Sequence, residues 1–212
     1  GDVIRVPPLR LAEAAPPAQP GGSLVRDLKH RVIYDKDGLL VINKPAGLAV
    51  HAGSGISWGL IEAMRVVFPE KPFMEVVHRL DRDTSGLLMV AEKRSVLRDL
   101  HDQLREGRIR KTYVALLAGR LKGATHTVNA PLHKGNLPNG ERIVRVSRDG
   151  KEALTEFRVL DRIGNATLVE ASPKTGRTHQ IRVHAQYLGH PLVGDEKYGN
   201  DDFNKAMKAH GA

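Results

Sequence analysis

The fold class is decided most clearly by residues 152–160, which read Glu-Ala-Leu-Thr-Glu-Phe-Arg-Val-Leu. Apolar and polar side chains alternate along this stretch, as they do in a strand with one buried face. Residues 165–171 follow across a short turn and form the predicted partner strand. A second hairpin is predicted from residues 32–35 and 39–43, which flank a turn that contains Gly38. Spacings this short suit hairpins better than βαβ crossovers, so we predict an α+β fold with a mixed, mostly antiparallel sheet.

The rest of the chain supplies further strands and helices. Strands are predicted at residues 76–79, 86–91 and 111–118, and helices at residues 57–68, 95–105, 178–188 and 203–210. Ser57 and Thr178 are the predicted N-caps of two of these helices, and Gly189 follows the end of the second one. Residues 1–30 are rich in Pro, Gly and Ala, which predicts a linker.

Composition narrows the possible function classes. The 212 residues include 33 Lys and Arg against 24 Asp and Glu, a formal charge of +9, and no Cys. The lack of Cys excludes a disulfide scaffold, a thiolate zinc site, an iron–sulfur cluster and cysteine catalysis. The positive charge favours an anionic partner, of which nucleic acid is the commonest for a basic domain. Neither a membrane helix nor a signal peptide is evident, so we expect a soluble, cytoplasmic protein with no membrane partner.

Three candidate motifs are rejected because their residue spacing or order does not match. Residues 53–59 contain Gly-x-Gly, but three residues rather than two precede the next Gly, so the dinucleotide fingerprint is not matched. Residues 174–178 lack the Gly-Lys-Ser/Thr order of a phosphate-binding P-loop. His179 and His184 are five residues apart, which does not stack both imidazoles on one helical face. We therefore expect no cofactor and no metal site.

The densest chemical cluster is residues 78–87, which read His-Arg-Leu-Asp-Arg-Asp-Thr-Ser-Gly-Leu. The segment contains two carboxylates, those of Asp81 and Asp83, and two guanidinium groups, those of Arg79 and Arg82. A capped turn would account for one of the two acids, but not for an arginine on each side. Asp81 and Asp83 are therefore both candidates for a reacting carboxylate.

Two other segments contain basic residues in patterns that suit the binding of an anionic ligand. Residues 176–184 read Gly-Arg-Thr-His-Gln-Ile-Arg-Val-His. If they are helical, the free N–H groups and the dipole at the N-terminus form an anion site, and the alternative is a solvated basic helix. The basic run at residues 105–111 leads into Tyr113. An aromatic ring in that place suits stacking on a nucleobase, although such a ring more often belongs to the core.

Taken together, these segments resemble the RNA pseudouridine synthases of the ribosomal large-subunit family. Four segments occur in the family's order: residues 43–47 as Asn-Lys-Pro-Ala-Gly, residues 78–87, residues 111–113 as Lys-Thr-Tyr, and residues 176–184. The second and fourth segments are long and specific. The resemblance covers about residues 30–200, and the whole run, including residues 78–86 and 135–147, is most similar to the C type within the family.

The resemblance implies a fold, a reaction and residue roles. The fold would be that of a pseudouridine synthase, with flanking helices and a central RNA-binding cleft. The reaction would be the cofactor-free isomerisation of uridines in large-subunit ribosomal RNA. Asp81 matches the essential aspartate, which acts on a flipped-out nucleotide. Tyr113 matches the tyrosine that stacks on the target base, and Arg182 matches the arginine that pairs with the aspartate. The residues expected to bind RNA are Arg79, Thr84, Arg177 and His179.

The resemblance also implies a domain organisation. Residues 31–212 would form the catalytic domain, which we expect to act as a monomer. Residues 1–30 would be a linker with the remnant of an S4-type RNA-binding domain, and the family's C-terminal tail would be missing. From the residues alone, two other functions stay open: a cofactor-free N-glycosylase or glycoside hydrolase, and an RNA-binding module without catalysis. For Asp81, attack on ribose C1′ and removal of a ribose proton both stay open.

Overall fold

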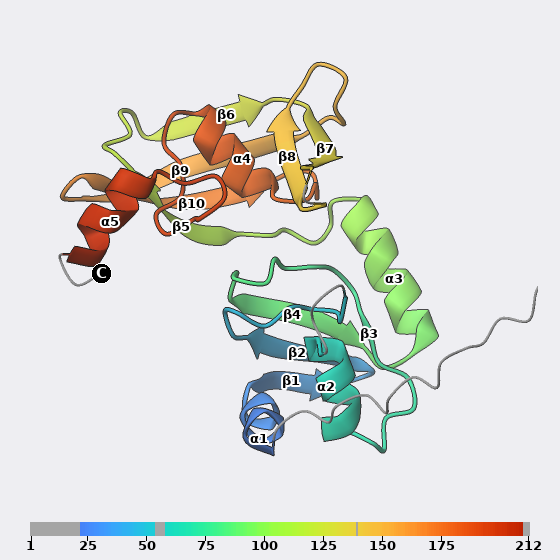
Figure 1. Cartoon of the computed structure of the whole chain (residues 1–212). Coiled ribbons are helices and arrows are strands. Elements are labelled where there is room, and N and C mark those ends of the chain that lie inside the picture. Colours follow the sequence, from blue (N-terminus) through green and yellow to red (C-terminus); the bar gives the residue numbers. More distant parts are fainter. Residues whose placement is uncertain (1–21, 54–57, 139, 210–212) are drawn as a thin grey trace, which may run out of the picture. The chain divides into compact units, whose positions relative to one another are not determined.

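The computed structural model describes residues 22–53, 58–138 and 140–209 (Figure 1). They form two compact units that divide the chain between Gln103 and Leu104. We call them unit 1 and unit 2, and each has its own antiparallel sheet. Among the helices that are described, none has both the length and the apolar character needed to cross a membrane.

Unit 1 is built on a four-stranded sheet with the order β1-β2-β4-β3. Its strands are β1 (Val32–Lys36), β2 (Leu39–Lys44), β3 (Glu75–Val76) and β4 (Gly86–Ala91), and its helices are α1 (Gly22–His30), α2 (Leu60–Val67) and most of α3 (Arg94–Arg105). Leu40 pairs with Val90, Ile42 pairs with Leu88, and all four side chains are fully buried. Residues directly opposite each other point to one face of a sheet, so this face forms the core. Helices α1 and α2 contact each other and add Leu28 and Met64 to the buried residues.

The start of α2 explains the glycine at position 59. A Cβ added to Gly59 would lie 2.3 Å from the carbonyl carbon of His51, so no larger residue fits. The Glu62 carboxylate accepts hydrogen bonds from the backbone N–H groups of Gly59 (2.9 Å) and Ala52 (3.0 Å) and thereby caps the helix. The predicted cap, Ser57, lies outside the described residues.

Unit 2 confirms the hairpin predicted from residues 152–171. Its larger sheet has the order β5-β10-β9-β6, with β5 (Tyr113–Ala118), β6 (Thr125–Asn129), β9 (Leu154–Ile163) and β10 (Ala166–Pro173). A second sheet joins β7 (Leu132–Asn136) to β8 (Arg142–Val146), and the helices are α4 (Gln180–Tyr187) and α5 (Asp201–Ala209). Phe157 of β9 and Val169 of β10 are buried with Ala185 of α4 in one cluster. This cluster fixes α4 to the sheet.

The structure corrects three details of the sequence-based prediction. Residues 22–30, predicted as part of the linker, form α1, because fully buried Leu28 anchors them to unit 1. The described strands form three antiparallel sheets instead of one mixed sheet. The helix predicted to be capped by Thr178 begins at Gln180 after His179, whose left-handed backbone (φ 52°) interrupts the helical run.

Candidate active site

In unit 1, the densest chemical cluster forms the loop from β3 to β4. The Met89 N–H donates to Nε2 of His78 (3.3 Å), which ties the start of the loop to β4. The Thr84 N–H donates to the Asp81 carbonyl (3.1 Å) and closes a turn around the two acids. The loop returns to the sheet at Gly86 with φ 122°, a backbone conformation that side-chain-bearing residues rarely adopt. The glycine is therefore required by the turn itself.

Lys44 is fully buried and bonded to this loop. Its ammonium donates to three backbone carbonyls, those of Pro45 (2.9 Å), Leu48 (2.8 Å) and Arg82 (2.9 Å). These bonds use all three N–H donors of the lysine. Burial lowers the pKa of Lys44 to about 8, against the effect of the negative charges on Asp83 and Asp81. The bond to Arg82 holds the residue that lies between the two acids.

The two acids of the loop have different surroundings. The side chain of Asp83 is 73% exposed, and its carboxylate pairs with Arg82 at 3.1 Å. An exposed ion pair of this kind contributes little to stability. Asp81 is half-buried, whereas Arg79 beside it is exposed and Thr84 is half-buried. A partly dry carboxylate interacts more strongly with nearby charges, so these surroundings favour Asp81 over Asp83 as the reacting group.

In unit 2, the turn before α4 is organised by Gln180, which is 4% exposed. Its Oε1 accepts hydrogen bonds from the Arg177 N–H (3.0 Å) and the Thr175 hydroxyl (2.7 Å). Its Nε2 donates to the Leu154 carbonyl (2.9 Å). The exposed Arg177 donates from Nε to the Glu152 carbonyl (2.9 Å). The turn is thus fastened to the start of β9, and α4 begins at a fixed place.

Tyr113 lies at the start of β5, directly opposite Ala171 of β10. Its ring is half-buried and packs against the cluster that includes Ala185 of α4. Next to it, a Cβ added to Gly176 would lie 3.4 Å from the Lys111 ammonium, whose pKa is lowered by burial. In unit 2, Tyr113 and α4 therefore pack against the same hydrophobic core.

Arg182 of α4 is bound by Asp195, an acid of the same unit. Its Nε donates to Oδ2 (2.6 Å) and its Nη2 to Oδ1 (3.0 Å), and the carboxylate is only 4% exposed. Burial alone would raise the pKa of Asp195, but the hydrogen bond and charge of Arg182 and the N–H groups of Tyr198 and Lys197 hold it below its usual value. The guanidinium carbon also lies 4.9 Å from the centre of the Tyr198 ring.

Tyr198 links this ion pair to two other segments. Its hydroxyl accepts a hydrogen bond from the N–H of Val144 in β8 (2.9 Å) and lies 2.8 Å from Nδ1 of His179. The two rings also meet edge to face. His179, predicted to bind RNA, thus has a role within the protein, and its contact with RNA stays a prediction.

Each unit gathers part of the predicted set. Unit 1 holds the loop with Asp81, and unit 2 holds Tyr113 and Arg182. The predicted pairing of Asp81 with Arg182 joins residues of different units and stays a prediction. Sequence reasoning missed Asp195 and Tyr198, although a Gly-Asp-x-x-Tyr-Gly run at residues 194–199 marks them. In the described part of the chain, no three His, Asp or Glu side chains are grouped as metal ligands.

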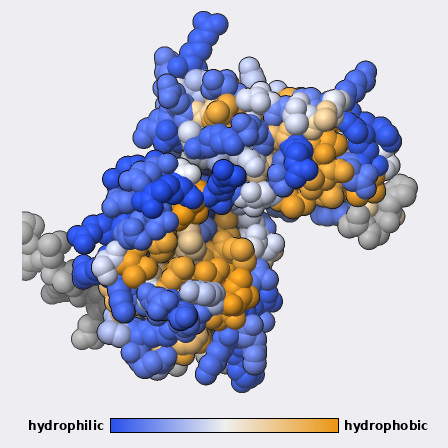
Figure 2. All heavy atoms as spheres, turned by 180° about the vertical axis from the view of Figure 1, so that it is seen from behind, coloured by the Kyte–Doolittle hydropathy of each residue, from blue (hydrophilic) through white to orange (hydrophobic). Residues whose placement is uncertain are grey.

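Apolar surface borders both site segments. Figure 2 shows apolar side chains gathered over part of the surface of each unit. Leu87, 61% exposed, follows the loop of unit 1, and Val114, 68% exposed, follows Tyr113 in unit 2. Single exposed apolar side chains are ordinary on protein surfaces and by themselves indicate no ligand.

A sequence profile of the RNA pseudouridylate synthase family matches residues 38–187. The chain therefore belongs to this family. It is 52% identical over 212 residues to ribosomal large subunit pseudouridine synthase C of Escherichia coli (strain K12), and 51% identical to the protein of that name from Haemophilus influenzae. These matches cover 100% of the chain and 66% of each relative, and they confirm the likeness to the C type.

Two solved structures have a similar fold. Human RNA Pseudouridylate Synthase Domain Containing 4 has a TM-score of 0.71 at 27% identity and covers 84% of this chain and 72% of its own. Human RNA Pseudouridylate Synthase Domain Containing 1 has a TM-score of 0.71 at 29% identity and covers 89% of this chain and 76% of its own. The chain has the pseudouridine synthase fold.

Proposed function

We propose that this chain isomerises uridines of large-subunit ribosomal RNA to pseudouridine, with Asp81 as the reacting carboxylate. The observation that carries the assignment of Asp81 is the difference in exposure within the loop: Asp81 is half-buried, whereas the side chain of Asp83 is 73% exposed. Family membership and the names of the relatives support the reaction and the type of RNA. In this proposal the protein acts as a monomer in the cytoplasm.

The reaction breaks the N1–C1′ bond of uridine, turns the base and joins its C5 to C1′. C5 loses a proton and N1 gains one, so reactant and product have the same formula and no cofactor is consumed. An ionised Asp81 would either attack C1′ as a nucleophile or remove a ribose proton as a base. Both roles need the carboxylate in its charged form.

In this proposal, unit 2 supplies the partners of the reacting group. Arg182 is a suitable counter-ion for Asp81 because a guanidinium keeps its charge at any physiological pH and binds a carboxylate through two N–H groups. The half-buried ring of Tyr113 would stack on the uracil, which must leave the RNA stack to be reached. Stacking and phosphate contacts would together offset the few kcal/mol that base flipping costs.

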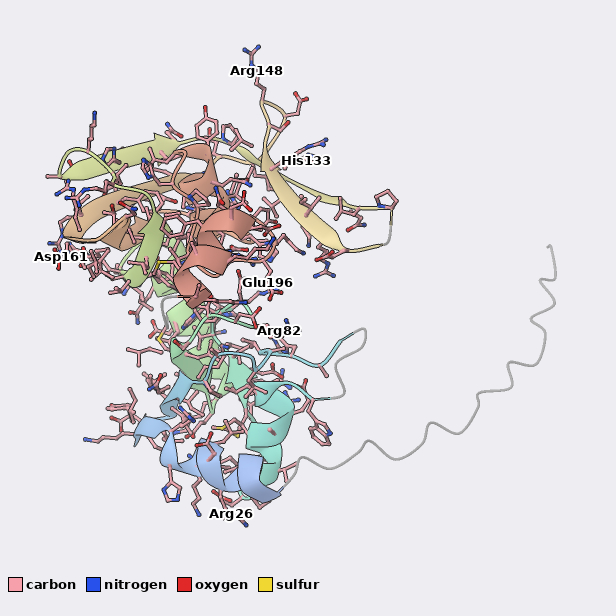
Figure 3. All side chains as sticks on the ribbon, turned by 60° about the vertical axis from the view of Figure 1, so that its left-hand side comes forward. Arg26, Arg82, His133, Arg148, Asp161 and Glu196 are labelled. Atoms are coloured by element: carbon pink, nitrogen blue, oxygen red, sulfur yellow. The ribbon has the colours of Figure 1, made fainter. Side chains whose placement is uncertain are left out.

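RNA binding would rest on the predicted contacts from Arg79, Thr84, Arg177 and His179, together with the charge of +9. The β7–β8 hairpin, which carries His133 (Figure 3), adds basic surface. His133 is paired with Arg145, and both residues are exposed. We expect the RNA affinity to fall by about one log unit per log of salt concentration for each phosphate contacted.

The test is tritium release from unmodified large-subunit ribosomal RNA labelled at C5 of uracil. We expect the wild-type chain and Asp83→Asn to release tritium, and Asp81→Asn to lose ~10³-fold or more in rate while it still binds the RNA. Free uracil as the product would instead indicate an N-glycosylase. RNA binding without any release by the wild-type chain would indicate a binding module.

A further inference from the structure

The carboxylate that holds Arg182 is itself held by its own turn. Oδ1 of Asp195 accepts hydrogen bonds from the N–H groups of Lys197 (2.9 Å) and Tyr198 (3.0 Å) as well as from Arg182. A carboxylate bound to the backbone two and three residues further on cannot swing without opening the turn. Arg182 is therefore attached to a rigid anchor.

The contact with Asp195 uses one edge of the guanidinium. Arginine has five N–H donors arranged so that two forks, Nε with one Nη and the two Nη groups together, can each bind a carboxylate. Asp195 takes the fork formed by Nε and Nη2. A second carboxylate that binds in the same bidentate way must use the fork formed by Nη1 and Nη2.

Tyr198 restricts the remaining freedom of the guanidinium. Its ring lies against the group, with 4.9 Å from the guanidinium carbon to the ring centre, and the tyrosine is 2% exposed. The N–H of Val144 and the ring of His179 hold the hydroxyl end of the tyrosine. The contact with the ring and the two hydrogen bonds to Asp195 together restrict the orientation of the guanidinium.

We propose that Asp195 is a positioning residue for the reaction, which fixes Arg182 so that its Nη1–Nη2 edge binds the ionised Asp81 when uridine is bound. This inference rests on the proposed function, in which Arg182 is the counter-ion of Asp81. The ring of Tyr198 supports the guanidinium of Arg182 by direct contact. Stability alone does not require such a pair, because apolar residues of similar volume commonly replace a buried ion pair without loss.

A double-mutant cycle tests whether Asp195 acts through Arg182. Single-turnover rates at saturating RNA, and RNA dissociation constants, are measured for the wild-type chain, Asp195→Asn, Arg182→Gln and the double variant. We expect Asp195→Asn to lower the rate by about 10–100-fold, as a misplaced group does, with the dissociation constant within ~3-fold of wild type. On the Arg182→Gln background, the same change should alter the rate by no more than ~2-fold.

The adjacent acid provides the matched control. Glu196 is exposed and one residue away (Figure 3), so Glu196→Gln makes the same change in charge without touching Arg182 and should keep the rate within ~2-fold. Thermal unfolding shows whether each variant is folded. If Asp195→Asn does not fold, Asp195→Glu takes its place in the cycle, since it keeps the charge and shifts the carboxylate by one methylene.

Two results would overturn the inference. One is a loss from Asp195→Asn that is equally large with and without Arg182, because the acid would then act on the fold as a whole. The other is an unchanged rate in folded Asp195→Asn. If the wild-type chain forms no pseudouridine in the RNA, it is the proposed function that fails, and that rate is measured first.

Discussion

Lys44 in unit 1 and Arg182 in unit 2 are buried or half-buried cations beside a predicted site segment, and they differ in what holds them. Lys44 is fully buried and donates only to backbone carbonyls among its described bonds. Arg182, with its side chain 22% exposed, is bound by the carboxylate of Asp195 and lies against an aromatic ring. One site therefore has neutral partners and the other has a charged one.

The difference has consequences for proton binding. Carbonyl oxygens satisfy the donors of an ammonium but do not cancel its charge, so burial lowers the pKa of Lys44 to about 8. In unit 2 the charge is cancelled within the pair, and the pKa of Asp195 is lowered because Arg182 and two N–H groups outweigh its burial. Lys44 is able to lose its proton in mild alkali, whereas Arg182 keeps its charge.

Replacement of Lys44 should have the largest effect on stability. Lys44→Met keeps the length of the side chain but removes the donors to three carbonyls, so we expect the free energy of unfolding to fall by about 2–3 kcal/mol. Hydrogen exchange should rise across residues 78–91, where the loop loses its bond at Arg82. Urea unfolding and exchange measure the two effects. The matched control is Lys36→Met at an exposed position of β1, and equal stability of the two variants would contradict the role of the three Lys44 hydrogen bonds.

The dependence of the free energy of unfolding on pH should distinguish Lys44 in unit 1 from Asp195 in unit 2, because the two groups titrate in different pH ranges. Because the folded pKa of Lys44 is about 8 and the ordinary value is 10.5, the unfolded chain binds the proton more tightly. The free energy of unfolding should therefore rise with pH between these values, by up to ~1.4 kcal/mol per pH unit from this group. Asp195 gives a dependence of the same sign in a different pH range, since its pKa is also lowered and the stability that it gives is lost as the pH falls below its ordinary value of 3.8.

Urea unfolding between pH 7.5 and about 10.5 tests the predicted rise in the free energy of unfolding, with Lys44→Met as the comparison. The rise should disappear in that variant. A rise that persists in Lys44→Met would assign it to other groups.

His184 should produce the smallest of the three effects. It is fully buried, with Nδ1 2.8 Å from the Thr155 hydroxyl and Nε2 2.9 Å from the Ala130 carbonyl. Burial lowers its pKa, against a smaller effect of the Ala130 carbonyl. Below about pH 6.5 the unfolded chain therefore binds a proton at this residue more readily than the folded chain does, and stability should fall between pH 7 and 5.

Urea unfolding of His184→Gln measures this contribution, and His133→Gln, at an exposed position of β7, is the control. The acid slope should weaken only in the first variant. An identical slope in both would mean that His184 is not the group concerned.

Local pattern predicted the strands and helices with regular apolar spacing. The hairpin of β9 and β10 is confirmed because an apolar face must be buried, and alternation shows which face that is. The predicted strands at 32–35 and 39–43 are confirmed as β1 and β2, which pair in an antiparallel hairpin. The short strands β6, β7 and β8 were missed, since segments such as Thr-His-Thr-Val-Asn are mostly polar and carry no clear period.

The same distinction applies to the candidate site, where some features were predicted from local sequence and others were seen only in the structure. The loop with Asp81 and the segment with Arg182 were found from clustered charge and from the family resemblance, both of which lie within short stretches of sequence. The bond from Lys44 to the Arg82 carbonyl joins residues 38 positions apart, and backbone acceptors leave no trace in the type of residue. The interval from Arg182 to Asp195 includes the end of a helix and a turn, so spacing does not predict that they pair.

The sequence by itself determined the family, the order of the main elements and the residues capable of the chemistry, because these depend on residue type and local period. Only the tertiary structure decided that residues 22–30 are a helix, that His179 rather than Thr178 precedes α4, and that Asp195 holds Arg182. These outcomes depend on which buried groups find partners across the fold. Burial of a charge or a polar group is decided by the whole chain, so its partner becomes evident only once the chain has folded.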